Sequence, residues 1–319
     1  MLKKVFFKLN SIEYSGDSVG EDVRIEIQIL DRHLTFKKRI KPKSILDVTE
    51  AVADFPTDRK IFEANIDIRI IEEDPLFNDT GKLTRLLKVN TENDGQQQLI
   101  YEVTVKEFRG RISKSKASFK VQLTAQVLQA EQYVIENKDG WLKVKIDGIT
   151  KVQALPAFLK VYVNTTDRTH KYFTVLEGKY KGKSGRVIKN TDGSSRFSVE
   201  TLRRDYNVLA LYSISKKQFT LNGKQYQAID DPEMPWKNGL YDIEIPDAPH
   251  TGGLNYPEAH KATVWFRIGH SGERYLHTGK RTLGCMTIIE TKRWPEIYNA
   301  LIKSRKADPD SVGTLEVVD

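Results

Sequence analysis

Runs in which apolar and polar residues alternate are the feature that most constrains the fold of this chain. The clearest are Val23–Leu30, Ile66–Ile71, Leu99–Val105 and Ala117–Ala125. A period of two places every second side chain on the same face of a strand, so each run predicts a strand with one buried face. Turn-forming clusters at 15–20 and 78–81 separate the runs. We therefore expect an antiparallel β-sandwich over residues 1–128.

Beyond this region the strand signals become shorter. Residues 129–165 hold two apolar strand-like runs and are interpreted as a β linker or middle segment. Residues 166–319 contain several short strand signals and the hairpin dipeptide Asn222-Gly223, which predict a second β domain. Apolar residues recur at helical spacing only over 292–304, where one C-terminal helix is expected. The expected fold class is mainly β, and the tail after Asp308 is expected to be mostly irregular.

The charge balance favours an anionic partner. The chain has 51 Lys and Arg against 43 Asp and Glu, a net charge of +8. Such an excess suits cell-wall polymers, acidic lipid surfaces or nucleic acid, although a well-solvated surface explains it equally well. No window approaches the eighteen apolar residues of a membrane-spanning helix. The first apolar run ends at Lys8, too soon for a signal peptide, so a leaderless export route is expected for action outside the cytoplasm.

The chain has a single cysteine, Cys285, which cannot form an internal disulfide. Thr282, Gly284 and Cys285 bring a hydroxyl, a flexible residue and a thiol into one short turn. Four of the six histidines precede this turn: His250, His260, His270 and His277. A thiol nucleophile needs a nearby base or cation, so the setting favours a reactive Cys285. The alternative is a buried cysteine that only packs.

This stretch resembles the catalytic domain of the L,D-transpeptidases (YkuD-type), whose hallmark is Ser/Thr-His-Gly-Cys after an upstream histidine. The threonine, glycine and cysteine of 282–285 match. The usual histidine before the glycine is Leu283, and the arginine that often follows the cysteine is Thr287. The compact 277–279 His-Thr-Gly is closer to divergent relatives, which include effectors injected by contractile secretion systems. The resemblance covers the C-terminal part of the chain.

The resemblance implies acyl transfer through a thioester on peptidoglycan stem peptides. Cys285 would attack the peptide carbonyl, with His277 as the first choice of base and His270, which fits the family's spacing better, as the second. Thr282 would orient the imidazole, and backbone N–H groups at Gly284 and Cys285 would hold the oxyanion. Water as acceptor gives an L,D-carboxypeptidase, and an amine gives a transpeptidase or D-amino-acid exchange.

Several further residues are candidates for contact with the stem peptide. They are Arg274, Arg281, His250 and Tyr275, of which the two arginines suit carboxylates. No cofactor is required by this chemistry. A zinc site built from the histidines with Asp247 and Glu258 is a rival interpretation, although the spacings match no compact zinc pattern. A second rival is a non-catalytic cell-wall-binding or structural protein, in which Leu283 and Thr287 mark a decayed site.

The N-terminal region resembles the calcium-dependent lipid-binding (C2-type) sandwiches. Carboxylates from two of its loops would then hold Ca²⁺: Asp17, Asp22, Asp74 and Asp79. Aspartate is also common in turns for local reasons, which is the simpler interpretation. An accessory domain that docks the enzyme to an anionic surface or to a secretion-system component is expected.

A basic, glycine-rich stretch at 171–188 resembles the KOW motif of nucleic-acid-binding barrels. Its glycines are Gly178, Gly182 and Gly185. The stretch lacks interleaved aromatic residues for base stacking, so a hairpin with solvated lysines is favoured. Nucleic acid is therefore not expected as a partner. The resemblance to the L,D-transpeptidases separately implies that the protein acts in the periplasm or cell wall.

Overall fold

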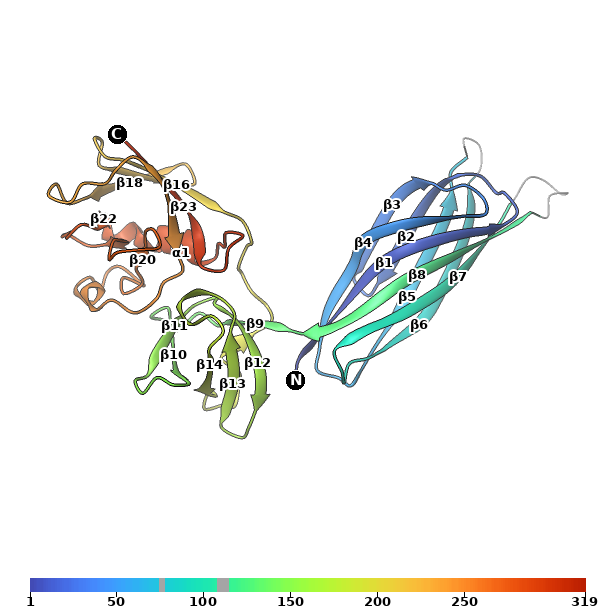
Figure 1. Ribbon diagram of the computed structural model, residues 1–319, viewed down its shortest axis with the longest axis horizontal. Helices are drawn as coiled ribbons and strands as arrows, with labels where there is room; N and C mark the ends of the chain where they lie inside the picture. The colour runs from blue at the N-terminus through green and yellow to red at the C-terminus, as the bar shows by residue number, and fades with distance from the viewer. Residues whose placement is uncertain (75–77, 108–114) are drawn as a thin grey trace. The chain divides into compact units, whose positions relative to one another are not determined.

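The computed structural model describes residues 1–74, 78–107 and 115–319, and the predicted mainly β fold with a C-terminal helix is confirmed (Figure 1). The chain forms two compact units, Met1–Ala130 and Glu131–Asp319. The first boundary falls two residues beyond the expected one at 128. The boundary expected at 165 falls inside one sheet, because strand β12 (Lys160–Thr166) pairs with β13 (His170–Val175).

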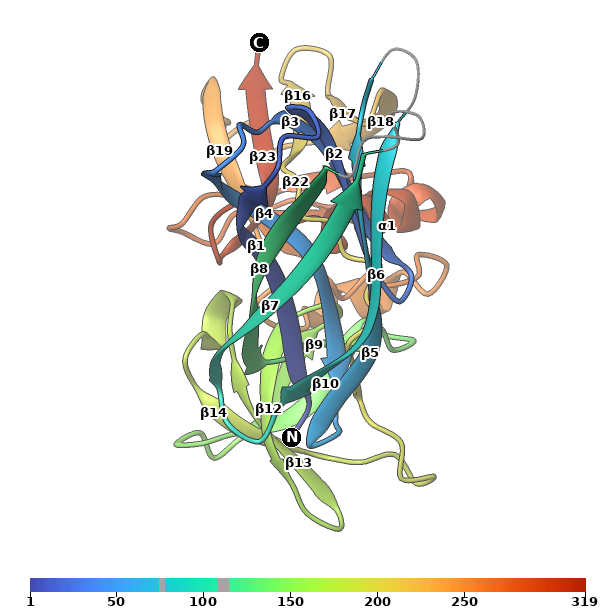
Figure 2. The same ribbon diagram turned by 90° about the vertical axis from the view of Figure 1, so that its right-hand side faces the viewer.

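The first unit consists of two four-stranded antiparallel sheets, ordered β4-β1-β8-β7 and β3-β2-β5-β6 (Figure 2). Their strands are β1 (Lys3–Gly16), β2 (Asp22–Ile29), β3 (Arg32–Arg39), β4 (Ser44–Thr57), β5 (Ile61–Glu72), β6 (Asp79–Asn90), β7 (Gly95–Lys106) and β8 (Lys116–Gln129). Along most of these strands, alternate residues point into one shared apolar core, against which the partly buried Leu34 and Phe36 of β3 also pack. The alternation read from the sequence therefore identifies the buried faces.

Strand β1 shows how the alternation can change phase. Phe7 and Leu9 are buried before a β-bulge at Leu9–Ser11, whereas Ile12 and Tyr14 are buried after it. A bulge adds one residue to the strand, so the buried set passes from odd to even positions while the core face stays the same.

The second unit is built on two sheets around one core (Figure 1). The first has the order β11-β10-β14-β13-β12-β9-β15 and adds to β12 and β13 the strands β9 (Glu131–Val134), β10 (Trp141–Ile146), β11 (Gln153–Pro156), β14 (Ser184–Ile188) and β15 (Phe197–Ser198). The second has the order β19-β23-β16-β17-β18-β22-β21-β20. Its strands are β16 (Val208–Ser213), β17 (Gln218–Leu221), β18 (Lys224–Ile229), β19 (Gly239–Glu244), β20 (Phe266–Arg267), β21 (Tyr275–Thr278), β22 (Met286–Ile288) and β23 (Ser311–Val318).

The last strand corrects the expectation of an irregular tail. β23 lies between β19 and β16, antiparallel to the first and parallel to the second. Val312, Leu315 and Val317 are buried, and Gly313 lies too close to the Val208 carbonyl to accept a side chain. Because the apolar run is short and contains a glycine, the sequence shows no clear alternation that would predict this central strand.

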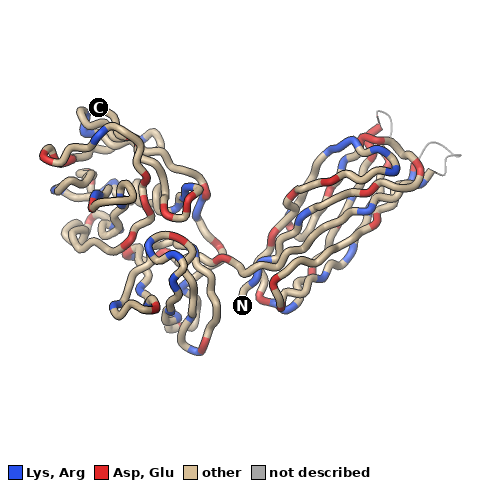
Figure 3. Tube along the Cα trace, viewed as in Figure 1, with Lys and Arg blue, Asp and Glu red and all other residues tan. Residues whose placement is uncertain are grey.

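The expected C-terminal helix is present as α1 (Trp294–Ile302), which follows a single 3₁₀ turn, η3 (Thr291–Arg293). Its apolar face is buried in the core of the second unit: Trp294, Ile297, Tyr298, Leu301 and Ile302. Across the described ranges, no helix has the length and apolarity needed to span a bilayer. Basic and acidic residues are interspersed along the chain in both units (Figure 3).

A buried ion cluster ties the two sheets of the second unit together. Glu177 accepts hydrogen bonds from Arg203 at 2.8 Å and from Arg305 at 3.0 Å, and Arg305 also donates to the Phe158 carbonyl. All three charged side chains are almost completely buried. Glu177 thus compensates the charge of Arg305 and shares that of Arg203 with the exposed Asp205, 3.0 Å from Arg203 Nε.

Glu177→Ala should lower the free energy of unfolding of the second unit by about 3 to 5 kcal/mol, because it leaves the fully buried Arg305 without its carboxylate partner. Urea unfolding followed by tryptophan fluorescence measures this, since all four tryptophans lie in that unit. The exposed Glu200→Ala is the matched control and should stay within about 0.5 kcal/mol of wild type. A loss below about 1 kcal/mol for Glu177→Ala would show that the cluster is dispensable.

Candidate active site

Two short parallel strands bring the candidate catalytic residues together. β21 pairs with β22, and His277 is in register with Thr287. Only residues 279–285 link the strands, far fewer than a usual parallel crossover needs. Cys285 directly precedes β22, the strand that pairs with the strand of His277, and is two residues, about 6.6 Å, out of register with His277.

The turn before Cys285 depends on glycine and on one arginine. Gly284 has φ = +80°, and a Cβ there would lie 2.8 Å from the Met234 methyl group. Arg274 donates through Nε to the Gly284 carbonyl at 2.7 Å, and its guanidinium stacks 3.7 Å from the Trp236 ring. Arg274, predicted as a substrate contact, thus holds the turn before Cys285 in place instead of projecting freely.

The role that the sequence analysis gave to Thr282, contact with the imidazole, belongs to a second threonine. The Thr282 hydroxyl donates to the Cys285 carbonyl at 2.6 Å and closes the turn. The hydroxyl that meets His277 belongs to Thr287, 3.1 Å from Nε2. Thr287, noted in the sequence only as a departure from the family pattern, therefore orients the imidazole. Its register with His277 becomes visible only once β21 and β22 are paired.

His277 is held as a neutral, buried imidazole. Nδ1–H donates to the Thr278 carbonyl at 3.0 Å, which leaves the lone pair of Nε2 to face Thr287. The ring stacks on Trp265 at 4.0 Å between centroids. Burial lowers the pKa of His277 to about 4, while its hydrogen bond to Thr278 opposes the shift and the nearby His250 adds to it. The imidazole is thus unprotonated at neutral pH.

Cys285 is also buried, with 7% of its surface exposed. Burial raises the pKa of the Cys285 thiol, although a hydrogen bond from the Tyr275 backbone and the charge of Arg274 act in the opposite direction. Sγ lies 3.9 Å from the Glu273 carbonyl. No hydrogen bond joins this thiol to His277 among the residues that the structure describes. The resting pair is therefore a neutral thiol beside a neutral imidazole.

An aromatic stack forms the wall behind this pair. Trp265 lies between His277 and His250, whose ring is parallel to the indole at 4.3 Å. Tyr275 meets His250 edge-on at 4.6 Å and donates its hydroxyl to Glu273 at 2.9 Å. Two predicted substrate contacts, His250 and Tyr275, thus join the site through Trp265, for which the sequence gives no catalytic signal.

A carboxylate also faces this stack. Asp247 Oδ1 lies 3.7 Å from His250 Nε2, and neither atom has a hydrogen-bond partner among the described residues. The sequence analysis considered Asp247 only as a zinc ligand. In the structure it supplies negative charge beside the His250 imidazole.

The second candidate base is occupied elsewhere. His270 Nε2 lies 2.7 Å from Asp242 and Nδ1 lies 3.3 Å from Glu244, both on β19. The hydrogen bond to Asp242 raises the pKa of His270, and the Glu244 charge adds to the shift. Arg281 contributes its carbonyl, 3.1 Å from the Thr287 hydroxyl, while its side chain is exposed. The geometry therefore favours His277 over His270 as the base.

The described residues contain no group of three or more His, Cys, Asp or Glu side chains placed to hold a metal ion. The zinc interpretation thus gains no support from the arrangement of the histidines. Of the proposed calcium ligands, Asp17 accepts the Lys116 N–H at 2.9 Å, a local turn role. Calcium binding by Asp17, Asp22, Asp74 and Asp79 stays a prediction, because residues 75–77 between the last two lie outside the described ranges.

The burial of His277 predicts a pH-dependent loss of stability. Below pH 6.5 the unfolded chain takes up a proton at His277 that the native state refuses until about pH 4. Protonation therefore favours unfolding across that window by up to about 3 kcal/mol. Tryptophan-monitored urea unfolding of wild type and His277→Gln between pH 7.5 and 4 measures it. The wild type should lose more stability than the variant, and parallel curves would contradict the buried neutral imidazole.

Comparison with known proteins leaves the chemistry of these residues as the basis for assigning a function. No protein-family model matches the chain, and no curated protein matches it.

Proposed function

We propose that the chain is a cysteine acyltransferase of the L,D-transpeptidase type, acting on peptidoglycan stem peptides. One observation carries the proposal: the only cysteine stands at a glycine turn beside the strand of a buried, tautomer-fixed histidine. A thiol, a base and an aromatic wall that lie together in a buried site are the components that thioester chemistry needs.

The proposed first step forms a bond between Cys285 Sγ and the stem-peptide carbonyl carbon. The thiol proton passes to His277 Nε2 and then to the leaving amine as the C–N bond breaks. Thr287 can release Nε2 without losing its hydrogen bond, because the Arg281 carbonyl also lies 3.1 Å from its hydroxyl. Water or a second amine then attacks the thioester, which gives the carboxypeptidase or the transpeptidase and exchange products.

The buried setting determines how the proton moves. A thiol with a raised pKa beside an imidazole with a pKa of about 4 does not form a resting thiolate–imidazolium pair. Proton transfer must then accompany attack on the carbonyl. The same low basicity makes His277 a good donor to the leaving amine. Substrate must also draw Cys285 and His277 together, as catalytic hydrogen bonds often tighten only in the complex.

The alternative is a non-catalytic cell-wall-binding protein with a decayed site. Leu283, which replaces the family's histidine, is 84% exposed. The thiol has no described hydrogen bond to His277. Both observations fit a site that has lost its chemistry while keeping its fold.

Digestion of purified peptidoglycan with the full chain, followed by mass spectrometry of the released fragments, tests the proposal. Loss of a terminal D-amino acid, or its replacement by an added one, would support the thioester enzyme. Unchanged tetrapeptide and pentapeptide stems would favour the binding protein. Toxicity on periplasmic but not cytoplasmic expression would further indicate an antibacterial effector.

A further inference from the structure

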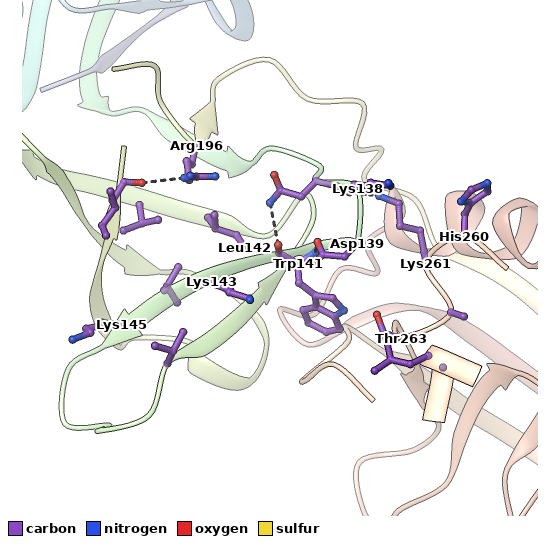
Figure 4. A pocket seen from close by; sticks show the side chains of 18 of the residues that line it. Lys138, Asp139, Trp141, Leu142, Lys143, Lys145, Arg196, His260, Lys261 and Thr263 are labelled. Carbon is purple, nitrogen blue, oxygen red and sulfur yellow. Dashed lines mark hydrogen bonds between the residues drawn. The ribbon is translucent and has the colours of Figure 1, made fainter. Parts of the chain in front are cut away.

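The second unit contains a cavity of about 1160 Å³ that lies apart from Cys285 (Figure 4). Strands β10 and β14 form one side of it, and residues 253–263 form the other. Its volume exceeds the 300 to 1000 Å³ or so of ordinary small-molecule sites. A segment of polymer fills such a space better than a metabolite does.

Four of the cations that line the cavity have no ionic partner among the described residues. Lys138, Lys143, Lys145 and Arg186 line it, are exposed, and make no ion pair with a described residue. Among the described residues that line the cavity, Asp139 is the only acidic one, and its Oδ1 accepts the Trp141 N–H at 3.2 Å. Figure 4 shows Lys143 and Lys145 on β10, opposite the segment that carries His260 and Lys261.

Two of these cations face each other across a strand pair. Lys145 on β10 is in register with Arg186 on β14. Like charges directly opposite one another destabilise a sheet, so the pair costs free energy unless an anion lies between them. This placement is what a site for a carboxylate would require.

Exposed apolar side chains lie around the same cavity. Val152, Ile188 and Leu254 line it and are 58%, 64% and 69% exposed. Large apolar groups left in water around one hollow mark a binding surface. The ligand should therefore combine negative charge with apolar groups, as a peptide with carboxylates and methyl-bearing side chains does.

The wall of the cavity also contacts the candidate active site. Tyr256 lines the cavity, accepts the Lys280 N–H at 2.9 Å, and has its ring against Gly279 in the loop between β21 and β22. Ala262, another lining residue, accepts the Trp265 indole N–H at 3.0 Å. A ligand in the cavity therefore lies against the residues that position the catalytic loop and the stack on His277.

We propose that this cavity binds the carboxylate-bearing strand of peptidoglycan whose stem peptide is presented to Cys285. The inference rests on the proposed function, for which it supplies the anchoring subsite. Nucleic acid suits the cavity less well, because Trp141 is almost fully buried and Tyr256 is engaged with the catalytic loop. Neither ring is free to stack on bases.

The test is fluorescence anisotropy with labelled, uncross-linked glycan strands that carry tetrapeptide stems. The full-length Cys285→Ala protein prevents turnover of the probe. Adding Lys143→Glu and Lys145→Glu should weaken binding about tenfold, and raised salt should reduce the difference. The matched control adds Lys181→Glu and Lys183→Glu, exposed residues of the same region outside the cavity lining, and should change binding less than about twofold.

Equal weakening by both pairs, or no weakening by the cavity pair, would overturn the assignment. Tighter binding to a single-stranded oligothymidylate than to the glycan strand would overturn it in favour of nucleic acid. Turnover of a free tetrapeptide, with Cys285 restored, separates the two proposals. If the free tetrapeptide is converted to product while the Lys143→Glu and Lys145→Glu substitutions leave strand binding unchanged, only the cavity assignment fails. If the cavity binds strand but no product forms, only the enzyme fails.

Discussion

Cys285→Ala should abolish stem-peptide turnover, lowering kcat/KM by at least about 10⁴-fold, because no other thiol exists in the chain to form the acyl intermediate. The measurement is mass spectrometry of peptidoglycan fragments over a time course with wild type and variant. The side chain is small and lies in the turn directly before β22, so the variant should stay folded. Its tryptophan fluorescence and urea midpoint check this.

A matched variant in the same turn separates the nucleophile from the loop. Leu283→Ala changes an 84% exposed side chain two residues away and should keep turnover within about threefold of wild type. If Leu283→Ala loses as much activity as Cys285→Ala, the loop shape matters more than the thiol. If Cys285→Ala retains wild-type turnover, the thioester mechanism is wrong.

Sequence periodicity predicted the sandwich and the helix because both bury one regular face. The alternating runs of the first unit became buried strand faces, and residues 292–304 became η3 and α1. Periodicity failed for β23, where Gly313 interrupts a short apolar run. A central strand with buried neighbours on both sides does not need the alternation that a half-exposed strand shows.

The candidate site was only partly predictable for a related reason. The sequence pointed to Cys285 and His277 because a thiol, a glycine turn and histidines gathered within one stretch. Thr287 gave no such signal, since its contact with His277 depends on the parallel pairing of β21 and β22. Arg274 looked like a free cation, yet the fold points it at the Gly284 carbonyl. Roles set by register and side-chain direction require the folded chain.

His277→Gln should lower kcat by about 10³-fold with little change in KM, because the base acts on the thiol proton in the transition state. His270→Gln is the matched control and should lose less than about threefold, since His270 binds the β19 carboxylates Asp242 and Glu244. Steady-state turnover of a free tetrapeptide measures both. The reverse order of losses would make His270 the base and would show that substrate reorganises the site.

The pH profile gives this prediction a second readout. With the pKa of His277 near 4, the imidazole stays neutral down to that pH, and kcat/KM should fall on the acid side only below about pH 5. An ordinary exposed histidine would start to lose activity near pH 6.5. Thr287→Val removes the hydroxyl at Nε2 and should lower kcat without moving the acid limb far, because burial against Trp265 dominates the shift. An acid limb near pH 6.5 in the wild type would place the working base outside the buried stack.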